Sequence, residues 1–316
     1  MKISVAMASY NGEQYIRKQI ESILHQTMPV DEIIITDDCS TDHTYDILLD
    51  IQAKAQDVSL NIIRNKENLG YKDNFKKAIS LCTGDYIFLC DQDDYWNNNK
   101  VETLINIMQT NKISVLSSSF TFMDANDDYL EIKKNRGFSN NNMIHKVLAP
   151  KSLTHMNIDD LLFHNPCQGC AMLIDKQVAQ EFVIMGDNAL PHDWEINILG
   201  NKFDGTYFYN VPLFHYRIHS TNTIGINSST AKDKVNEKIR IKAQQDALGA
   251  VNFTFKVGLK GKIDQSSLQK FLETNIVNLK SQKFFSVFKQ QLIYRSYYVL
   301  LKPFLGRMAD LVYTLK

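Results

Sequence analysis

The chain has 316 residues, of which 44% are hydrophobic and 22% charged, and its 35 basic side chains balance 35 acidic ones. This composition is typical of a folded globular protein with one large or two ordinary domains, and it excludes a disordered or collagen-like chain. Because the formal net charge is +0, nothing attracts the protein as a whole to nucleic acid, and we predict no nucleic-acid partner.

The sequence shows no pattern typical of a secretory signal or of a membrane span. The apolar stretch after Lys2 is too short to cross a bilayer, and no later window holds the roughly 18 apolar residues that a span needs. The chain has 5 cysteines, an odd number that favours a reducing compartment, so we expect a cytoplasmic protein. Cys167 and Cys170 lack the second ligand pair of a zinc site, and we interpret them as buried thiols.

Short apolar runs alternate with helix-like runs through residue 120. The apolar runs predict strands over 3–9, 32–36, 60–64, 86–90 and 114–122. Helical spacing predicts helices over 13–26, 41–55, 72–81 and 100–109, the second of them capped by Ser40 or Thr41. Strands separated by helices of this length form βαβ units, so we predict an α/β fold with a mainly parallel central sheet flanked by helices.

The pattern after residue 120 is less regular. It predicts a loop over 124–142, helices over 155–163, 176–185 and 192–200, and strands over 167–174 and 206–216. A lysine-rich helical tail follows residue 228. We therefore expect one domain over 1–227, with halves at 1–120 and 121–227, and a helical C-terminal extension over 228–316.

Polar residues follow the carboxyl ends of four predicted strands. They are Ser9 to Asn11, Asp37 with Asp38, residues 65–70, and Asp91 to Asp94. Ligands of parallel sheets bind beyond these strand ends, so we expect the four segments to form one crevice.

The acidic run Asp91-Gln92-Asp93-Asp94 follows the apolar run YIFLC. Its carboxylates repel each other unless a cation lies among them, and oxygen ligands suit Mg²⁺ or Mn²⁺. A solvated acidic loop is the alternative, which is less expected at the end of a central strand. Because the sequence has no glycine-rich phosphate loop, a nucleotide site here would need a metal to neutralise the diphosphate.

Three further sets of polar residues have two interpretations each. Asp37 and Asp38 can bind a pyrimidine or ribose, or form the turn before a helix, and we expect one aspartate to do each. Asp193 can be a general base, although spacing alone favours an acid in the first turn of a helix. His219 can ligate a metal or contact phosphate, whereas a lone histidine is more often structural.

The last segment of the chain is basic and aromatic. Against the single acid Asp310, residues 280–316 contain Lys280, Lys283, Lys289, Arg295, Lys302, Arg307 and Lys316. Phenylalanine, tyrosine and leucine side chains lie between them. The sign asymmetry favours a helix on an anionic membrane surface, and a packing helix or a dimer contact is the alternative.

Several motifs occur together and in order. They are SVAMASYNG (4–12), DDCSTD (37–42), NLG (68–70) with Asn74-Phe75, GDYIFLCDQDDYW (84–96), HDW (192–194) and YRIH (216–219). Together they resemble the family-2 glycosyltransferases of the GT-A fold, and within these the bacterial rhamnosyltransferase-like branch. The resemblance covers residues 1–225 and leaves the tail outside.

The resemblance implies a GT-A type nucleotide-diphospho-sugar transferase fold and a role for each matching residue. Asp193 would be the catalytic base, Asp38 would hold the nucleotide base with Tyr10 stacked near it, and a divalent metal, Mg²⁺ or Mn²⁺, would be bound by Asp91, Asp93 and His219. The other expected contacts to the nucleotide-sugar are Ala8, Asn11, Asn68, Gly70, Asn74, Asp91 and Gln92. The resemblance also implies that Gly169, His192 and Trp194 lie on the side of the site that binds the acceptor.

Two departures from the family pattern matter. The Q-x-x-R-W motif and membrane spans of the processive synthases are missing, so we expect transfer of a single sugar. Cys39 stands where glycine or asparagine is common, so its turn must tolerate a side chain.

We therefore expect an inverting transferase that moves one sugar, L-rhamnose from dTDP-L-rhamnose, onto a saccharide acceptor in cell-surface polysaccharide biosynthesis such as that of capsule or O-antigen. A UDP-hexose donor, galactosyl or glucosyl, is the alternative. A nucleotidyltransferase or a non-catalytic scaffold fits less well, because the first lacks its basic glycine-rich loop and the second has no reason to keep repelling carboxylates. We expect a lipid-linked or oligosaccharide acceptor, and a peripheral location at the inner face of the bacterial cytoplasmic membrane.

Overall fold

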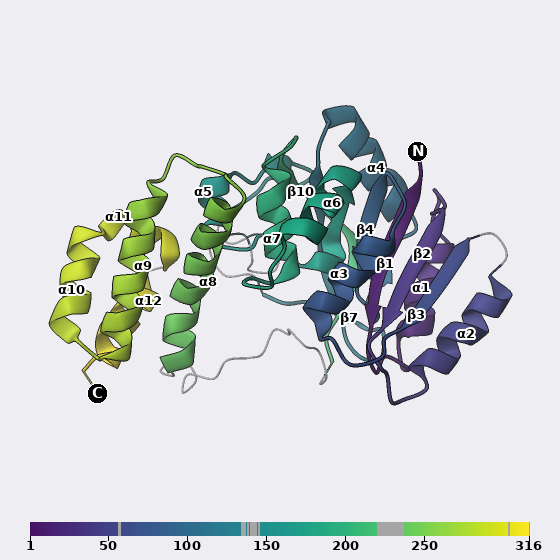
Figure 1. The fold of residues 1–316 in the computed structure, drawn as a ribbon, viewed down its shortest axis with the longest axis horizontal. Coiled ribbons are helices and arrows are strands. Elements are labelled where there is room, and N and C mark those ends of the chain that lie inside the picture. The colour runs from purple at the N-terminus through teal and green to yellow at the C-terminus, as the bar shows by residue number, and fades with distance from the viewer. Residues whose placement is uncertain are drawn as a thin grey trace. The chain divides into compact units, whose positions relative to one another are not determined.

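A computed structural model describes residues 1–55, 58–133, 137, 139, 144, 146–219, 237–302 and 304–315 (Figure 1). Its contacts divide the chain into two compact units. Unit 1 consists of Met1–Met156 and Asn165–Gly225, and unit 2 of Asn157–His164 and Ile226–Lys316. The short segment Asn157–His164 therefore groups with the C-terminal helices.

Unit 1 is built on one mixed sheet, ten-stranded over the described residues. Its strands are β1 (Ile3–Ser9), β2 (Glu32–Asp37), β3 (Ser59–Arg64), β4 (Tyr86–Cys90), β5 (Tyr95–Trp96), β6 (Val115–Met123), β7 (Tyr129–Leu130), β8 (Leu153–His155), β9 (Met172–Asp175) and β10 (Thr206–Arg217). They lie in the order β3-β2-β1-β4-β9-β6-β10-β5, with β7 beside β6 and β8 beside β10. Strands β3, β2, β1 and β4 are parallel, β9 is antiparallel to both of its neighbours, and β6 and β10 are again parallel.

Helices cover the sheet, which explains why β1 and β2 are buried along nearly their whole length. The helices of unit 1 are α1 (Ile16–Leu24), α2 (Thr44–Lys54), α3 (Tyr71–Leu81), α4 (Lys100–Asn111), α6 (Lys176–Met185) and α7 (His192–Gly200). Helix α3 packs on β1 and β2 and forms one layer with α6 and α7, while α1 packs against α2 (Figure 1). Every residue of β2 is buried, as expected for a parallel strand with both faces covered.

The chain changes direction across the sheet at β1. It passes from β1 to β2 and β3 on one side, and returns to β4 on the other. In α/β sheets, ligands bind at such a switch point, beyond the carboxyl ends of the strands. The α/β class and the mainly parallel sheet predicted from the sequence are confirmed.

Two elements begin at other residues than the sequence predicted, one helix and one strand. Helix α2 begins at Thr44 and has His43 at its cap, because Ser40 is instead hydrogen-bonded to Asp37 in the preceding turn. The predicted strand over 167–174 shortens to β9, because a 3₁₀ turn occupies Gly169–Ala171.

Two more differences come from pairing between distant segments. The helix predicted over 155–163 shortens to α5 (Ile158–Leu161), since β8 pairs with β10. The acidic loop after β4 contains the unpredicted strand β5, which also pairs with β10. Cys167 and Cys170 are buried free thiols, as predicted.

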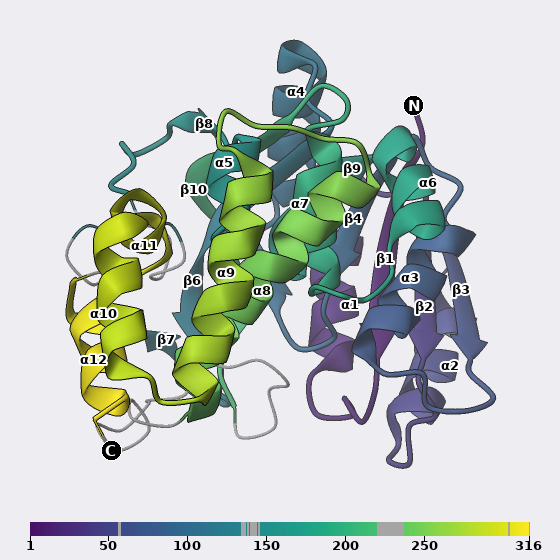
Figure 2. The ribbon, with the colours of Figure 1, turned by 60° about the vertical axis from the view of Figure 1, so that its left-hand side comes forward.

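Unit 2 consists of helices. In addition to α5 they are α8 (Glu237–Lys256), α9 (Gln265–Lys280), α10 (Phe284–Ile293), α11 (Arg295–Leu301) and α12 (Phe304–Tyr313), shown in Figure 2. Its core includes Ile241, Leu279, Val287, Leu311 and Tyr313. Among the described helices of the chain, none combines the length and the apolarity needed to cross a bilayer.

The turn after β2 has a left-handed residue, as the sequence suggested. Cys39 has φ 62°, in a region that strains most side chains. In the turn after β1, Asn11 also has a positive φ, of 48°. We expect Cys39→Gly and Cys39→Asn to keep the free energy of unfolding near its original value. Cys39→Val should lower it by about 1–3 kcal/mol, because a branched Cβ is least compatible with positive φ.

Denaturant unfolding measures this ranking. Cys82→Val is the matched control, since Cys82 is also half-buried but has φ −69°. An equal loss of stability for both valine variants would show that backbone strain at Cys39 is not the cause.

Candidate active site

A pocket of about 920 Å³ lies within unit 1, at the carboxyl edge of the sheet. Its wall brings together nearly all of the residues that the sequence singled out: Ala8, Tyr10, Asn11, Asp38, Asn68, Gly70, Asn74, Asp91, Gln92, Asp93, Gly169, His192, Asp193 and His219. The exception is Trp194, which is buried and does not belong to this wall. The prediction of one crevice is therefore confirmed.

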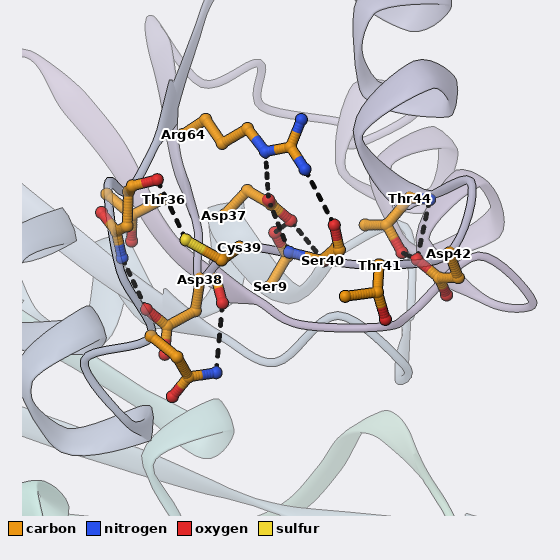
Figure 3. A network of polar contacts seen from close by, with 12 residues as sticks. Ser9, Thr36, Asp37, Asp38, Cys39, Ser40, Thr41, Asp42, Thr44 and Arg64 are labelled. Atoms are coloured by element: carbon orange, nitrogen blue, oxygen red, sulfur yellow. Dashed lines mark hydrogen bonds and ion pairs between the residues drawn. The ribbon is translucent and has the colours of Figure 1, made fainter.

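Asp37 has the turn-forming role that was expected of one of the two aspartates. Asp37 is fully buried, and its carboxylate accepts hydrogen bonds from the backbone amide and the hydroxyl of Ser40 at 3.1 and 2.5 Å (Figure 3). Arg64 lies 3.8 Å from the same carboxylate. Asp37 therefore forms the turn, and Asp38 is the aspartate that reaches the pocket.

The Asp38 carboxylate also holds the loop that follows β3. It accepts hydrogen bonds from the backbone amides of Leu69 and Gly70, both at 2.8 Å, and from the side-chain amide of Asn65 at 2.7 Å. A carboxylate has about four acceptor positions, so one remains for a ligand. Asn74 is in turn bonded to Asn65 and to the Thr36 carbonyl, which makes it a support of this loop.

Two hydrogen bonds from the Gln92 side chain hold the turn after β1. The Gln92 side chain accepts from the Tyr10 amide and donates to the Tyr10 carbonyl, both at 2.9 Å. The Gln92 amide group packs against Gly12, where a Cβ would lie 2.3 Å from its oxygen. Gln92 therefore supports the turn, and the Tyr10 ring, 47% exposed, is left facing the pocket.

The acidic motif after β4 points in two directions. Asp91 and Asp93 line the pocket, whereas Asp94 is fully buried behind it. Burial and the neighbouring charge of Asp93 raise the pKa of Asp91 to about 7. The Asp94 pKa is raised too, chiefly by burial, and one of its carboxylate oxygens has no hydrogen-bond partner among the described residues.

The end of β10 holds this motif in place. Arg217, fully buried, donates from its backbone amide to the Asp94 carboxylate and from Nε to the Asp93 carbonyl, at 3.1 and 2.7 Å. Its guanidinium also lies 4.4 Å from the centre of the Tyr15 ring. Two residues later, His219 Nε2 lies 2.8 Å from the Asp93 carboxylate. Arg217 thus positions both members of the Asp93–His219 pair.

Lys100 supplies a buried positive charge beneath the motif. Its ammonium group lies 3.8 Å from the centre of the Trp96 ring and 4.4 Å from that of Phe214, and it donates to the Cys170 carbonyl at 2.9 Å. Burial lowers the Lys100 pKa to about 8, while Cys90, Cys170 and the nearby acids oppose this shift. This cation offsets part of the repulsion among the carboxylates.

The donor set suits a divalent cation. The carboxylate oxygens of Asp91 and Asp93 are ligands that suit Mn²⁺ and Mg²⁺, and the imidazole of His219 is a nitrogen ligand that suits a transition metal such as Mn²⁺ better than Mg²⁺. The raised pKa of Asp91 shows that its charge is under-compensated by the protein, a condition that a bound cation relieves. Among the described residues, the three possible ligands whose ligand atoms all lie within 4.8 Å of each other are Asp91, Asp94 and Cys170, so the structure brings this inner group together and not the predicted set of Asp91, Asp93 and His219.

Asp193 lies in the first turn of α7, and its carboxylate is held from two segments. It accepts hydrogen bonds from the Asn165 side chain and from the backbone amides of Trp194, at 2.8 Å, and Gly169. The Asn165 carbonyl oxygen accepts in turn from Asn197 at 2.9 Å, which fixes the direction of the Asn165 amide. Burial raises the Asp193 pKa to about 6, and these hydrogen bonds limit the rise. The carboxylate is therefore oriented, ionised at neutral pH and basic enough to accept a proton.

His192 explains the glycine at position 169. Its ring stacks on Phe75 with centroids 4.4 Å apart, and burial lowers its pKa to about 3, so it is neutral at working pH. A Cβ on Gly169 would lie 2.5 Å from His192 Nε2. The close approach of His192 thus requires glycine at position 169.

Three of the supporting residues, Asn165, Lys100 and Tyr15, lie outside the motifs, and Arg217 belongs to the YRIH motif but had no role assigned to it. Asn165, Arg217, Lys100 and Tyr15 act through contacts with segments far away in the chain. Asn165 had one usable signal, its place shortly before Gly169, which the resemblance assigns to the acceptor side.

Comparison with known proteins identifies relatives of this pocket's scaffold. The profile described as Glycosyl transferase family 2 matches residues 4–180. The chain is 34% identical over 176 residues to the putative teichuronic acid biosynthesis glycosyltransferase TuaG of Bacillus subtilis, covering 55% of this chain and 62% of TuaG. It is 28% identical over 235 residues to the dTDP-rhamnosyl transferase RfbG of Shigella flexneri, covering 71% and 75%.

A third relative uses another donor. The UDP-Glc:alpha-D-GlcNAc-diphosphoundecaprenol beta-1,3-glucosyltransferase WfaP of Escherichia coli is 36% identical over 118 residues, covering 37% of this chain and 45% of WfaP. The chain therefore spans only about half to three quarters of these curated relatives.

Solved structures share the fold at low sequence identity. Staphylococcus aureus TarS 1–349 in complex with UDP has a TM-score of 0.59 and 14% identity, over 99% of this chain and 89% of that one. The mannosyltransferase PcManGT of Pyrobaculum calidifontis, in complex with GDP-Man and Mn²⁺, has a TM-score of 0.54 and 12% identity, over 99% and 87%. These likenesses establish the GT-A fold.

The ligand assignment predicts the effect of single substitutions on metal binding. We expect Asp93→Asn and His219→Gln each to weaken Mn²⁺ binding by about tenfold or more, because each removes a ligand at the pocket. Isothermal titration of Mn²⁺ into the protein measures this without any substrate. Asp46→Asn, an exposed acid on α2, is the control that should bind normally.

Two outcomes would contradict this assignment. Unchanged affinity in both pocket variants would remove the ion from Asp93 and His219. A loss confined to Cys170→Ala and Asp94→Asn would place it in the inner group instead.

Proposed function

This chain belongs to glycosyl transferase family 2, and on that premise we propose that it is an inverting, metal-dependent glycosyltransferase that moves one sugar from a nucleotide-diphosphate donor to a saccharide acceptor. One observation carries the proposal. A single pocket holds a free aromatic ring at Tyr10, an acceptor position on Asp38, the Asp93–His219 pair and the oriented carboxylate of Asp193. These are the groups needed for a nucleotide base, a diphosphate and a nucleophile, in one place.

Tyr10 and Asp38 are the residues that we assign to the nucleotide. The Tyr10 ring can stack on the base, and the remaining acceptor position of Asp38 can receive a base N–H or a ribose hydroxyl. Held by Asp91, Asp93 and His219, a divalent ion would supply the positive charge that stabilises the departing diphosphate. The fixed loops around the pocket hold these groups in position before the donor binds.

Asp193 is the residue that we assign to proton transfer. Its carboxylate takes the proton of an acceptor hydroxyl as that oxygen forms a bond to the anomeric carbon. The bond between that carbon and the donor's phosphate oxygen breaks, and its electron pair leaves with the nucleoside diphosphate. Attack on the opposite side from the leaving group inverts the configuration. The neutral His192 ring beside Asp193 adds no competing charge.

We propose dTDP-L-rhamnose as the donor, supported by the match to RfbG over most of its length. UDP-glucose or UDP-galactose is the alternative, supported by WfaP, which is named for UDP-Glc, and by the fold shared with TarS in complex with UDP. The acceptor would be a lipid-linked saccharide of bacterial cell-surface polysaccharide synthesis, as the names of TuaG and WfaP suggest. The enzyme would work in the cytoplasm, peripherally at the inner face of the membrane.

A donor panel tests this function directly. Purified protein is screened for binding and slow hydrolysis of dTDP-, UDP- and GDP-sugars, with and without Mn²⁺. We expect metal-dependent turnover of dTDP-L-rhamnose. Turnover of a UDP-hexose alone would keep the pocket assignments and replace the sugar, whereas no binding of any donor would refute the transferase proposal.

The raised pKa of Asp193 predicts the pH dependence of transfer. Because the ionised form is active, kcat/KM should fall tenfold for each pH unit below about 6. Asp193→Asn should lower kcat by about a hundredfold or more at every pH. Full turnover by Asp193→Asn would rule out its role as base.

Replacing Asn165 should shift the pH dependence of kcat/KM and leave the enzyme active. Asn165→Leu takes away a hydrogen bond to the ionised Asp193, so the acid limb should move to higher pH. Asn201→Ala is the matched control: it removes another amide of the α7 region, which donates to the Met156 carbonyl. A lower kcat with an unmoved limb in Asn165→Leu would mean that Asn165 affects only packing.

A further inference from the structure

Two helices of unit 2, α10 and α12, present regularly spaced apolar side chains to solvent. On α10, Phe285, Phe288 and Leu292 are 83%, 44% and 64% exposed, and they recur at i, i+3 and i+7. On α12 and directly after it, the same spacing continues through Leu305, Met308, Val312 and Leu315, which are 79%, 41%, 54% and 68% exposed. We call these seven residues the apolar face.

The side chains of the apolar face do not belong to the core of unit 2. The opposite sides of the same helices already fill the core with Val287 on α10 and with Leu311 and Tyr313 on α12. Helices α10 and α12 pack against each other, and Gln291 on α10 donates to the Arg307 carbonyl on α12 at 2.9 Å (Figure 2). The two stripes therefore belong to one pair of neighbouring helices, and isolated exposed apolar residues would show no such spacing.

The exposed charges of the segment that carries the apolar face, residues 280–316, have one sign. Asp310, the one acid between residues 280 and 316, is fully buried, and both of its carboxylate oxygens lie 2.9 Å from Lys302 Nζ. The exposed charges of this segment are therefore all positive: Lys280, Lys283, Lys289 and Arg295. Burying the acid within the unit leaves the surface basic.

We propose that the apolar face is a lipid-binding surface that inserts into the interfacial region of an anionic bilayer. Apolar side chains enter the acyl boundary while flanking lysines and arginine contact anionic headgroups. In a symmetric contact between two copies of this chain, equal basic rims would meet, and the like charges would repel. None of the described helices can cross a bilayer, so binding would be parallel to the membrane plane.

This inference rests on the membrane location in the proposed function and names the surface responsible. It does not depend on the donor, the metal or Asp193. Its test therefore needs no substrate, and it can fail while the transferase assignment stands.

Vesicle flotation of the full chain tests the inference. The protein should float with phosphatidylcholine–phosphatidylglycerol vesicles, and much less with phosphatidylcholine alone or at high salt. Leu305→Glu with Phe285→Glu should weaken binding by at least about tenfold, because each places a carboxylate at the acyl boundary. Each of Lys283→Gln, Lys289→Gln and Arg295→Gln should weaken binding to anionic vesicles by about fivefold.

The control is Ile184→Glu, which changes a 74% exposed apolar side chain on α6 in unit 1 and should float normally. The far-ultraviolet circular dichroism and the denaturant unfolding of the Leu305 and Phe285 double variant should match those of the original chain, which shows that it is folded. Equal flotation of the double variant and the original chain would overturn the proposal. So would a dimer in solution that Leu305→Glu converts to monomer, since the face would then bind a second copy.

Discussion

The pocket depends on how the protein holds three aspartates at the end of β4. Asp91, Asp93 and Asp94 repel each other, and the half-buried position of Asp91 and the buried position of Asp94 strengthen that repulsion. Arg217 binds the backbone of this segment and Lys100 places a cation beneath it. Both residues reach the motif only because β10 returns beside β6 and α4 follows β5. The charge balance of the motif therefore requires the whole sheet, and a divalent cation would complete it.

Many of the polar residues around the pocket are already satisfied by the protein. Gln92 holds the Tyr10 backbone, Asn74 holds the Thr36 carbonyl, and Asp38 uses most of its acceptor positions on the loop after β3. Such hydrogen bonds fix the pocket before a ligand arrives, which lowers the entropy cost of binding. The groups left for a ligand are few, and they are the Tyr10 ring, one position on Asp38, the Asp93–His219 pair and the Asp193 carboxylate.

In the C-terminal unit, a buried ion pair determines the charge of the surface. Its single acid in the last helices, Asp310, is paired with Lys302 inside the unit, close to the Tyr298 hydroxyl. This pair connects the end of α11 to α12, and it removes the one acidic side chain of that segment from the surface. A buried ion pair thus leaves a basic exterior beside an apolar stripe, a combination that suits an anionic interface better than water.

The sequence by itself determined the elements whose signals are local. Strands β1 and β4 and helices α6 and α7 follow from apolar periodicity, and the parallel sheet follows from their alternation, so the pocket's place at the strand ends was predictable. The aspartates after β2 and β4 were noticed because their type is unusual at a strand end, whereas the roles of Ala8, Asn74, Gly169 and Asp193 came from the family resemblance. Only the tertiary structure decided which of them face a ligand, that Trp194 lies outside the pocket wall, and that Asn165, Arg217 and Lys100 orient the others. The physical reason is distance along the chain: Arg217 and the Asp93 carbonyl are 124 residues apart, and no periodicity connects them until the sheet brings β4 and β10 into one layer.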